Sequence, residues 1–167
     1  MALTSEIVIG RIKELLGEDL LASNESFGML AINVSASRNR ELLEFLFNDT
    51  TLQMNFLTDL TGAHYPERKG GELEVIYHLH SLVNNFRLRI KCQIPVEKPE
   101  IKSVVQLYSA ANFMERETYD FFGIIFKDHP NLRRILNVDE MDYFPMRKEY
   151  PLEDQTRTDK EDKYFGR

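Results

Sequence analysis

The chain has 167 residues, 43% of them hydrophobic and 29% charged, with a formal net charge of −6 and a pI of about 5.3. This composition is ordinary for a one-domain globular protein. The acidic balance disfavours a general nucleic-acid binder, which needs many Lys and Arg to neutralise phosphates. The one cysteine, Cys92, allows neither an internal disulfide nor a four-thiolate iron–sulfur cluster, and it favours a reducing cytosolic setting.

The N-terminal part of the chain predicts two helices and a strand. Thr4 or Ser5 can cap a helix over residues 4–16, whose apolar side chains fall near one face. A strand over residues 29–34 and a helix over 38–47 follow. No basic segment precedes a long apolar run, so we expect no signal peptide. No stretch approaches the roughly 20 apolar residues of a membrane helix, so any membrane link is expected to go through a partner.

Three strands are expected next, over residues 52–60, 72–80 and 86–94. The last of them, FRLRIKCQI, alternates apolar with charged or amide side chains and has the clearest two-residue period in the chain. In the first, one face is expected to carry Leu52, Met54, Phe56 and Leu60. The alternation indicates an antiparallel sheet with one face in water and the other under helices.

A third helix is predicted over residues 103–122, ended by Gly123. After it, residues 128–151 are rich in proline, charges and aromatics, and residues 153–167 contain no aliphatic side chain that forms a core. Such a tail buries too little apolar surface to order itself, so we expect it to be extended or bound to a partner.

The predicted fold class is therefore α+β in two layers: a mostly antiparallel sheet covered by helices, with an extended C-terminal tail. We expect an α+β core domain over residues 1–126 and an extended partner-binding segment and tail over residues 127–167.

No glycine-rich dinucleotide or phosphate loop occurs in the sequence. His78 and His80 lie two residues apart on one predicted strand and so share a face. A metal site needs further ligands, and no Cys or other His accompanies them, so we interpret both as histidines of the solvent face.

The densest charged group in the sequence is Glu115, Arg116, Glu117 and Asp120. Paired carboxylates can act as an acid and a base, but two carboxylates at this spacing also occur on any solvated, ion-paired helix, where Arg116 would pair with Asp120. Neighbouring aromatic side chains favour a third interpretation, a protein interface, because Arg and aromatics are enriched there. These neighbours are Phe113, Tyr119, Phe121 and Phe122.

A second concentration of charge follows at His129, Arg133 and Arg134. If these residues are helical, the adjacent arginines point in different directions, so that one pairs internally and the other outward. Without a phosphate loop, a partner's carboxylates are more plausible targets than phosphate.

Residues 115–134, ERETYDFFGIIFKDHPNLRR, resemble the signature of the 30-kilodalton subunit of complex I, known in bacteria as the C subunit. That signature consists of Glu-Arg-Glu, an acid, two apolar or aromatic residues, a histidine and an Arg-Arg pair at fixed spacing, and every position matches. The resemblance extends to the predicted sheet over 57–95 and to FPMRKEYPLE (144–153), and it covers roughly residues 1–153.

Two departures from the family pattern are visible. The family often has Trp at the places of Tyr108 and Phe113; aromatic size is retained here, so we expect the packing role to survive. The family often has Gly before the His-Pro pair, where this chain has Asp128, so the local turn is expected to differ.

The resemblance implies a non-catalytic structural subunit in the peripheral arm of a complex I-type NADH:quinone oxidoreductase. It implies no cofactor in this chain, with flavin, iron–sulfur clusters and quinone in partner subunits. The implied partners are chiefly the 49-kilodalton quinone-site subunit and cluster-bearing neighbours, at the cytoplasmic face of the inner (plasma) membrane.

We expect Arg133, Arg134 and Arg147 to form intersubunit ion pairs. The expected signature and interface set is Glu115, Arg116, Glu117, Asp120, Phe121, Phe122, His129, Arg133, Arg134, Arg147, Tyr150 and Pro151.

Three alternatives remain open from the sequence. The nearest is the equivalent subunit of a membrane-bound nickel–iron hydrogenase or a related quinone-reducing complex. A free-standing hydrolase would use Glu115 or Glu117 with His129, but the sequence offers no nucleophile for it. A nucleic-acid binder is disfavoured by the excess of acids.

Overall fold

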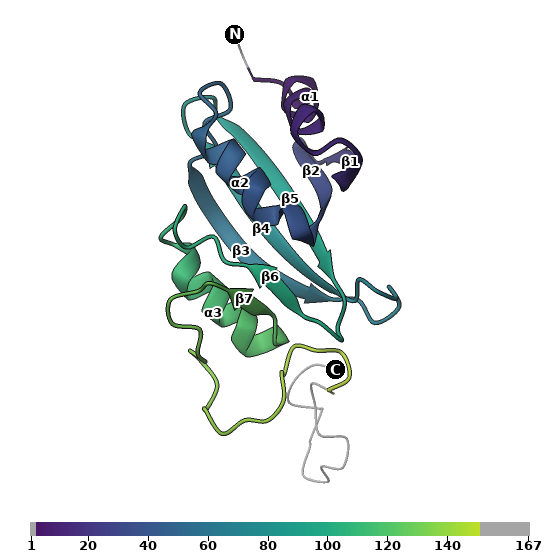
Figure 1. Ribbon diagram of the computed structural model, residues 1–167, viewed down its shortest axis with the longest axis vertical. Coiled ribbons are helices and arrows are strands. Elements are labelled where there is room, and N and C mark those ends of the chain that lie inside the picture. The colour runs from purple at the N-terminus through teal and green to yellow at the C-terminus, as the bar shows by residue number, and fades with distance from the viewer. Residues whose placement is uncertain (1–2, 151–167) are drawn as a thin grey trace, which may run out of the picture.

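Five strands form one mixed sheet in the computed structural model, which describes residues 3–150 (Figure 1). Their order is β1-β2-β5-β4-β3, and every neighbouring pair is antiparallel except the parallel pair β2 and β5. The predicted α+β fold with a mostly antiparallel sheet is therefore confirmed. The strands are β1 (Leu20–Ser26), β2 (Met29–Ser35), β3 (Phe56–His64), β4 (Leu73–Ser81) and β5 (Phe86–Ile94).

Three α-helices, α1 (Ser5–Leu16), α2 (Asn39–Asn48) and α3 (Ala111–Phe122), pack on one face of this sheet. Short 3₁₀ turns precede β1 (Gly17–Asp19) and α2 (Ala36–Arg38), and two three-residue strands, β6 (Glu100–Lys102) and β7 (Ile125–Lys127), form a separate parallel pair. Figure 1 shows α2 lying across the sheet, with α3 and the β6–β7 pair toward one end. Within residues 3–150, no helix combines the length and apolar character needed to cross a membrane.

The alternation in β5 places one set of its side chains in the core and the other set on the opposite face, as predicted. Leu88, Ile90, Cys92 and Ile94 are buried in one cluster with the apolar sides of the helices. The predicted cap of α1 is also present, since the Thr4 hydroxyl accepts a hydrogen bond from the Ile7 N–H at 3.4 Å.

The predicted strand over 52–60 was wrong at its start. Leu52 and Met54 are buried as expected, but they lie before β3, which begins at Phe56. The Phe56 side chain is 47% exposed, because a register shift between Leu57 and Asp59 breaks the two-residue period of the strand.

The helix predicted from residue 103 begins at Ala111, because residues 103–110 form turns in which β-branched and polar side chains replace a helical pattern. Its predicted end is confirmed: Gly123 takes the left-handed conformation at φ +71°. The helix lies very close to β3, and a Cβ atom at Gly62 would be 2.6 Å from the Phe122 ring. Glycine at position 62 therefore sets the distance between sheet and helix.

The predicted extended tail, residues 151–167, lies outside the described residues, as does the candidate Pro151. The division of the chain at residue 126 stays a prediction.

Candidate functional site

Residues 128–150, here called the strap, follow β7 and pass along α3 from its first turn to its last, without regular secondary structure. Two contacts tie its far end to the core. The Arg147 Nε donates to the Phe122 carbonyl at 2.7 Å, and the Lys148 N–H donates to the His64 Nδ1 at 2.9 Å. The strap is therefore fixed both to the end of α3 and to the edge strand β3.

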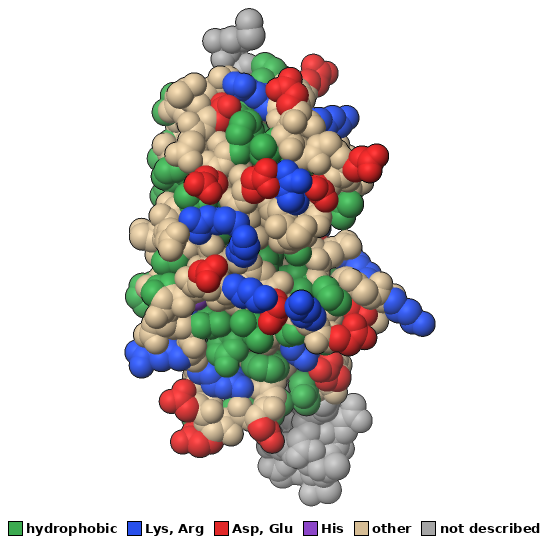
Figure 2. Space-filling model, in the orientation of Figure 1, with side chains coloured by type: hydrophobic (Ala, Val, Ile, Leu, Met, Phe, Trp, Pro, Cys, Tyr) green, Lys and Arg blue, Asp and Glu red, His purple; other side chains and the backbone are tan. Residues whose placement is uncertain are grey.

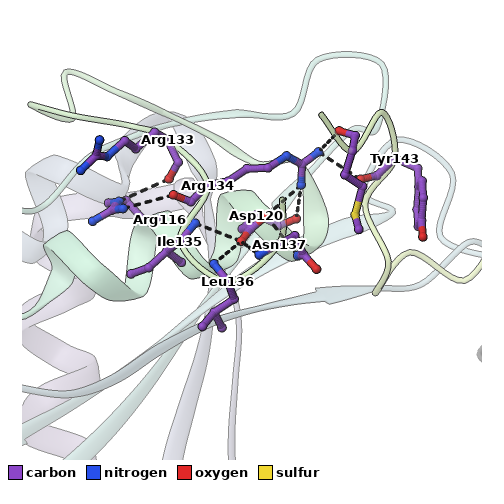
Figure 3. Close-up of polar contacts among 9 residues, drawn as sticks. Arg116, Asp120, Arg133, Arg134, Ile135, Leu136, Asn137 and Tyr143 are labelled. Carbon is purple, nitrogen blue, oxygen red and sulfur yellow. Dashed lines mark hydrogen bonds and ion pairs between the residues drawn. The ribbon is translucent and has the colours of Figure 1, made fainter. Parts of the chain in front are cut away.

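Asp120 is the centre of the contacts between α3 and the strap (Figure 3). One carboxylate oxygen accepts the backbone N–H groups of Ile135, Leu136 and Asn137 at 3.1, 2.8 and 2.9 Å. The other accepts from the Arg134 guanidinium at 2.8 Å and from the Asn137 amide at 3.1 Å. Burial alone would raise the pKa of Asp120, but these five donors outweigh it and hold the pKa well below its ordinary range.

Arg134 connects the end of α3 to two further points of the strap. Its Nη2 donates to the Met141 and Tyr143 carbonyls at 2.6 and 3.1 Å, while its Nη1 faces Asp120. Both Nη groups of Arg134 thus donate within the chain, and its expected intersubunit ion pair stays a prediction. The Arg147 Nε also bonds to the core, and its guanidinium lies 4.8 Å from the Phe144 ring centre. The expected intersubunit ion pair of Arg147 likewise stays a prediction.

Arg116 does not pair with Asp120 as the helical spacing had predicted. It donates instead to the carbonyl oxygens of Arg133 and Arg134 at 3.3 and 3.1 Å. Figure 3 shows the Arg133 side chain pointing away from this network, and it is exposed. The prediction that one arginine of the pair bonds internally is confirmed for Arg134, although neither arginine is on a helix. The outward pairing of Arg133 stays a prediction.

Glu115 is fully buried, so the interpretation of this acid as part of a solvated, ion-paired surface was wrong. Its Oε1 accepts the Val104 N–H at 2.7 Å, and its Oε2 has no hydrogen-bond partner. Burial raises the pKa of Glu115 to about 7, against the opposing effects of hydrogen bonds from Ser103 and Val104 and of the charge on Arg40. Glu117, two residues on, is exposed.

The aromatic residues of this region have divergent environments. Phe122 packs on β3 and Phe121 is half-buried, whereas Phe113 is exposed, with the Arg116 guanidinium 5.9 Å from its ring centre. Tyr108 keeps the packing role expected of it: its ring meets Phe47 edge-on at 5.3 Å, and its hydroxyl donates to a backbone carbonyl.

His129 is held by backbone groups at both ring nitrogens. Its Nδ1 accepts the Asn131 N–H at 3.0 Å, which leaves Nε2 to donate to the Asn112 carbonyl at 3.1 Å. The Glu115 carboxylate, which the hydrolase alternative would pair with His129, accepts a hydrogen bond from the Val104 N–H. Within residues 3–150, the hydrogen bonds that Glu115 and His129 make to backbone groups therefore do not join the two side chains.

No metal centre is formed within the described residues, where no three His, Cys, Asp or Glu side chains gather in a suitable arrangement. His78 and His80 lie on the helix-free face of the sheet, where His78 accepts a hydrogen bond from Arg89.

Five large apolar side chains are exposed on the strap, among exposed charged and polar ones. Leu136 and Val138 are 65% and 61% exposed, and Tyr143, Met146 and Tyr150 are each more than a third exposed. Figure 2 shows hydrophobic side chains grouped over the region of α3 and the strap, bordered by both basic and acidic side chains. Charged groups thus hold the strap from within, and apolar groups face outward, as at the centre of protein interfaces.

Sequence reasoning missed Asn137 and the backbone N–H groups of residues 135–137, which bind Asp120. No local sequence pattern identifies these groups, because the strap has no periodicity and Asp120 lies 15 to 17 residues earlier in the chain.

The model of the family described as "Respiratory-chain NADH dehydrogenase, 30 Kd subunit" matches residues 32–156 of this chain. The chain belongs to this family. The resemblance of residues 115–134 to the 30-kilodalton family is thereby confirmed. Of the signature residues, Arg116, Asp120, His129 and Arg134 make the side-chain contacts between α3 and the strap.

Curated relatives agree with this membership. The C subunit of the NADH-quinone oxidoreductase of Roseiflexus castenholzii is 38% identical over 152 residues, covering 91% of this chain and 87% of that protein. The same subunit of the Streptomyces coelicolor enzyme is 41% identical over 125 residues, and the match covers 75% of this chain but only 50% of that longer protein.

Two solved structures share the fold. The trypsin-resistant fragment (1-134) of Nqo5 is 29% identical with a TM-score of 0.64, and the match covers 74% of this chain and 98% of the fragment. A chain in the membrane-bound sulfane sulfur reductase, an archaeal respiratory membrane complex, has a TM-score of 0.73 and covers 88% of this chain and 85% of its own length. At 23% identity, that second likeness shows the fold alone.

Proposed function

We propose that this chain is a non-catalytic structural subunit in the peripheral arm of a complex I-type NADH:quinone oxidoreductase. In this role it braces the quinone-site subunit, the 49-kilodalton partner, and contacts cluster-bearing neighbours. It contributes to proton-coupled electron transfer from NADH to quinone by holding those partners in place. Family membership supports a place in such an assembly.

One observation carries the structural role: the buried Asp120 carboxylate fixes the strap, and the strap presents exposed apolar side chains such as Leu136 and Val138. A surface fixed before binding loses less conformational entropy on association, which favours a tight and specific complex. An apolar surface with a charged border is typical of protein–protein interfaces rather than of catalytic clefts.

The absence of a redox cofactor from this chain is part of the proposal. Cys92 is the only cysteine in the sequence, and it is buried in the core. Burial raises the pKa of the Cys92 thiol to about 12, so it remains protonated near neutral pH and is a poor metal ligand. Flavin, clusters and quinone are accordingly assigned to the partners, and the chain reaches the cytoplasmic face of the inner membrane only through them.

The proposal is tested by changing the outward face of the strap without touching its internal contacts. The double variant Leu136→Asp with Val138→Asp should reduce co-purification of the chain with the quinone-site subunit from native membranes by at least about tenfold, since charges at an interface core are strongly disfavoured. The matched control, Leu82→Asp with Val83→Asp, alters an equally exposed apolar pair in the β4–β5 turn. Equal co-purification of both double variants with the partners would contradict the proposal.

A further inference from the structure

The face of the sheet opposite the helices carries a row of basic side chains. On β5, Arg87, Arg89 and Lys91 alternate with core residues, and on β4 His78 and His80 do the same. Within residues 3–150 no helix packs on this face, because α1, α2 and α3 all contribute to the core on the other side. The chain as a whole has a net charge of −6, so this basic row is opposite in sign to the net charge of the chain.

Only one end of this row is neutralised within the chain. Glu74, almost fully buried, lies 3.6 Å from the Lys91 ammonium and 2.9 Å from the Arg68 guanidinium. By contrast, Arg87 and Arg89 have no carboxylate within 4.0 Å among the described residues. Two arginine charges are therefore left for a group outside this part of the chain.

The Arg89 side chain is held in a defined direction by His78. Its Nε donates to the His78 Nε2 at 2.8 Å, and the His78 Nδ1 lies 3.6 Å from the Asp59 carboxylate on β3. A guanidinium held at Nε still presents its two Nη groups, the fork that binds a carboxylate through two parallel hydrogen bonds. Arg89 is thus positioned in advance for such a ligand.

The spacing of the arginines fits an extended polypeptide. Side chains two residues apart on a strand stand about 7 Å from each other and point the same way. Arg87 and Arg89 therefore match carboxylates at alternate positions of an extended acidic segment. The neighbouring Ala31 and Asn33 on β2 have short side chains, which leaves room beside Arg89 and Lys91 for such a segment.

We propose that the helix-free face of the sheet docks an extended acidic segment of a neighbouring subunit in the same assembly, with Arg87 and Arg89 as its carboxylate receptors. This inference rests on the proposed function, because it takes the partner from that assembly. It uses a surface on the opposite side of the sheet from the strap, so the chain would be held by two separate faces.

Photocrosslinking in the assembled complex tests the inference. Asn33 pairs with Lys91 in the sheet and points to this face, so p-benzoyl-phenylalanine in place of Asn33 reports on whatever covers it. After irradiation of the purified complex, mass spectrometry should identify a crosslinked peptide from another subunit with Asp or Glu at alternate positions. A crosslink to lipid, to nucleic acid or to a neutral or basic peptide would overturn the inference, as would an uncrosslinked chain inside an intact complex.

Charge reversal supplies the matched comparison. Arg87→Glu with Arg89→Glu should lower the crosslinking yield at least tenfold, whereas Lys13→Glu with Lys98→Glu, which makes the same change in charge elsewhere, should leave it within twofold. Arg87→Gln with Arg89→Gln removes the same receptors with a smaller electrostatic change and should also lower the yield. Equal yields in the arginine variants and the lysine control would refute the docking role.

The crosslinking experiment also separates failure of the docking inference from failure of the proposed function. One variant carries the photocrosslinker at position 33 and no other change. If this variant is missing from the purified complex, both the proposed function and the docking inference are wrong. If that chain is present and Asn33 meets no acidic segment, the docking inference alone is wrong.

Discussion

Asp120 and Arg134 meet at 2.8 Å at the join between α3 and the strap, with less than a tenth of either side chain exposed. The same carboxylate accepts three successive backbone N–H groups, so one side chain orders a turn of the strap. Residues that the sequence marked as candidates for contact with partners therefore act first within the chain. Their effect on a partner is indirect, through the apolar surface that they hold in position.

Replacement of the central carboxylate should destabilise the chain strongly. Asp120→Asn leaves Arg134 buried without its counter-charge and places an amide donor among backbone donors, so the free energy of unfolding should fall by about 3 kcal/mol. Urea denaturation of the full chain measures this change. The control Glu117→Gln removes an exposed acid from the same helix and should change stability by less than about 0.5 kcal/mol. Similar losses in the two variants would show that Asp120 has no special structural role.

Glu115 should make the chain less stable as the pH rises toward neutrality. Its pKa is 4.5 in an ordinary setting and about 7 in the folded chain, so the unfolded chain releases the proton more readily. Stability should therefore fall between these two pH values by roughly 3 kcal/mol and then level off.

The variant Glu115→Gln should remove that fall, which unfolding measurements between pH 5 and 8 would detect. Asp120 does not interfere in this range. Its pKa lies below the ordinary 3.8, so its contribution is present above pH 3.8 and is lost only as the pH falls further. Parallel stability curves for Glu115→Gln and the unchanged chain would contradict the prediction.

Asp128 should be a site of backbone strain. It takes φ +65°, the left-handed region that favours glycine, at the position where the family often has Gly. Asp128→Gly should therefore raise the free energy of unfolding by about 0.5 kcal/mol, and Asp128→Val should lower it by about 1 to 2 kcal/mol. Thermal denaturation of the two variants compares them directly, and a valine variant as stable as the glycine variant would disprove the strain.

The parts of the fold that were predicted from sequence are those with a local pattern. Strand β5 alternates over nine residues, and its inner and outer sets were assigned correctly. Strand β1 was missed, because one half-buried and six exposed positions leave no apolar alternation; it is paired with β2 through its backbone. The parallel pairing of β2 with β5 joins segments more than 50 residues apart, which no local period reports.

The candidate site shows the same division between local and distant contacts. Ala111, Glu115, Thr118 and Phe122 form the buried stripe of α3 at spacings of four, three and four residues. The position of Glu115 in that stripe indicated burial. The prediction nevertheless placed it at the surface, because charged side chains are usually exposed. Asp120 lies off the stripe and is buried by the strap rather than by the sheet, so its environment depends on residues 134–137, beyond the helix.

The central claim, that internal contacts of the strap serve assembly rather than chemistry, is tested most directly by the adjacent arginines. Arg134 is held inside the chain and Arg133 is exposed, so Arg134→Ala and Arg133→Ala make the same chemical change in opposite environments. Assembled complex per membrane and NADH:quinone turnover per assembled complex should be measured together. We expect Arg134→Ala to lower the amount of complex several-fold with normal turnover per complex, and Arg133→Ala to leave the amount of complex closer to normal. Normal assembly of the Arg134→Ala complex with impaired turnover would contradict the account.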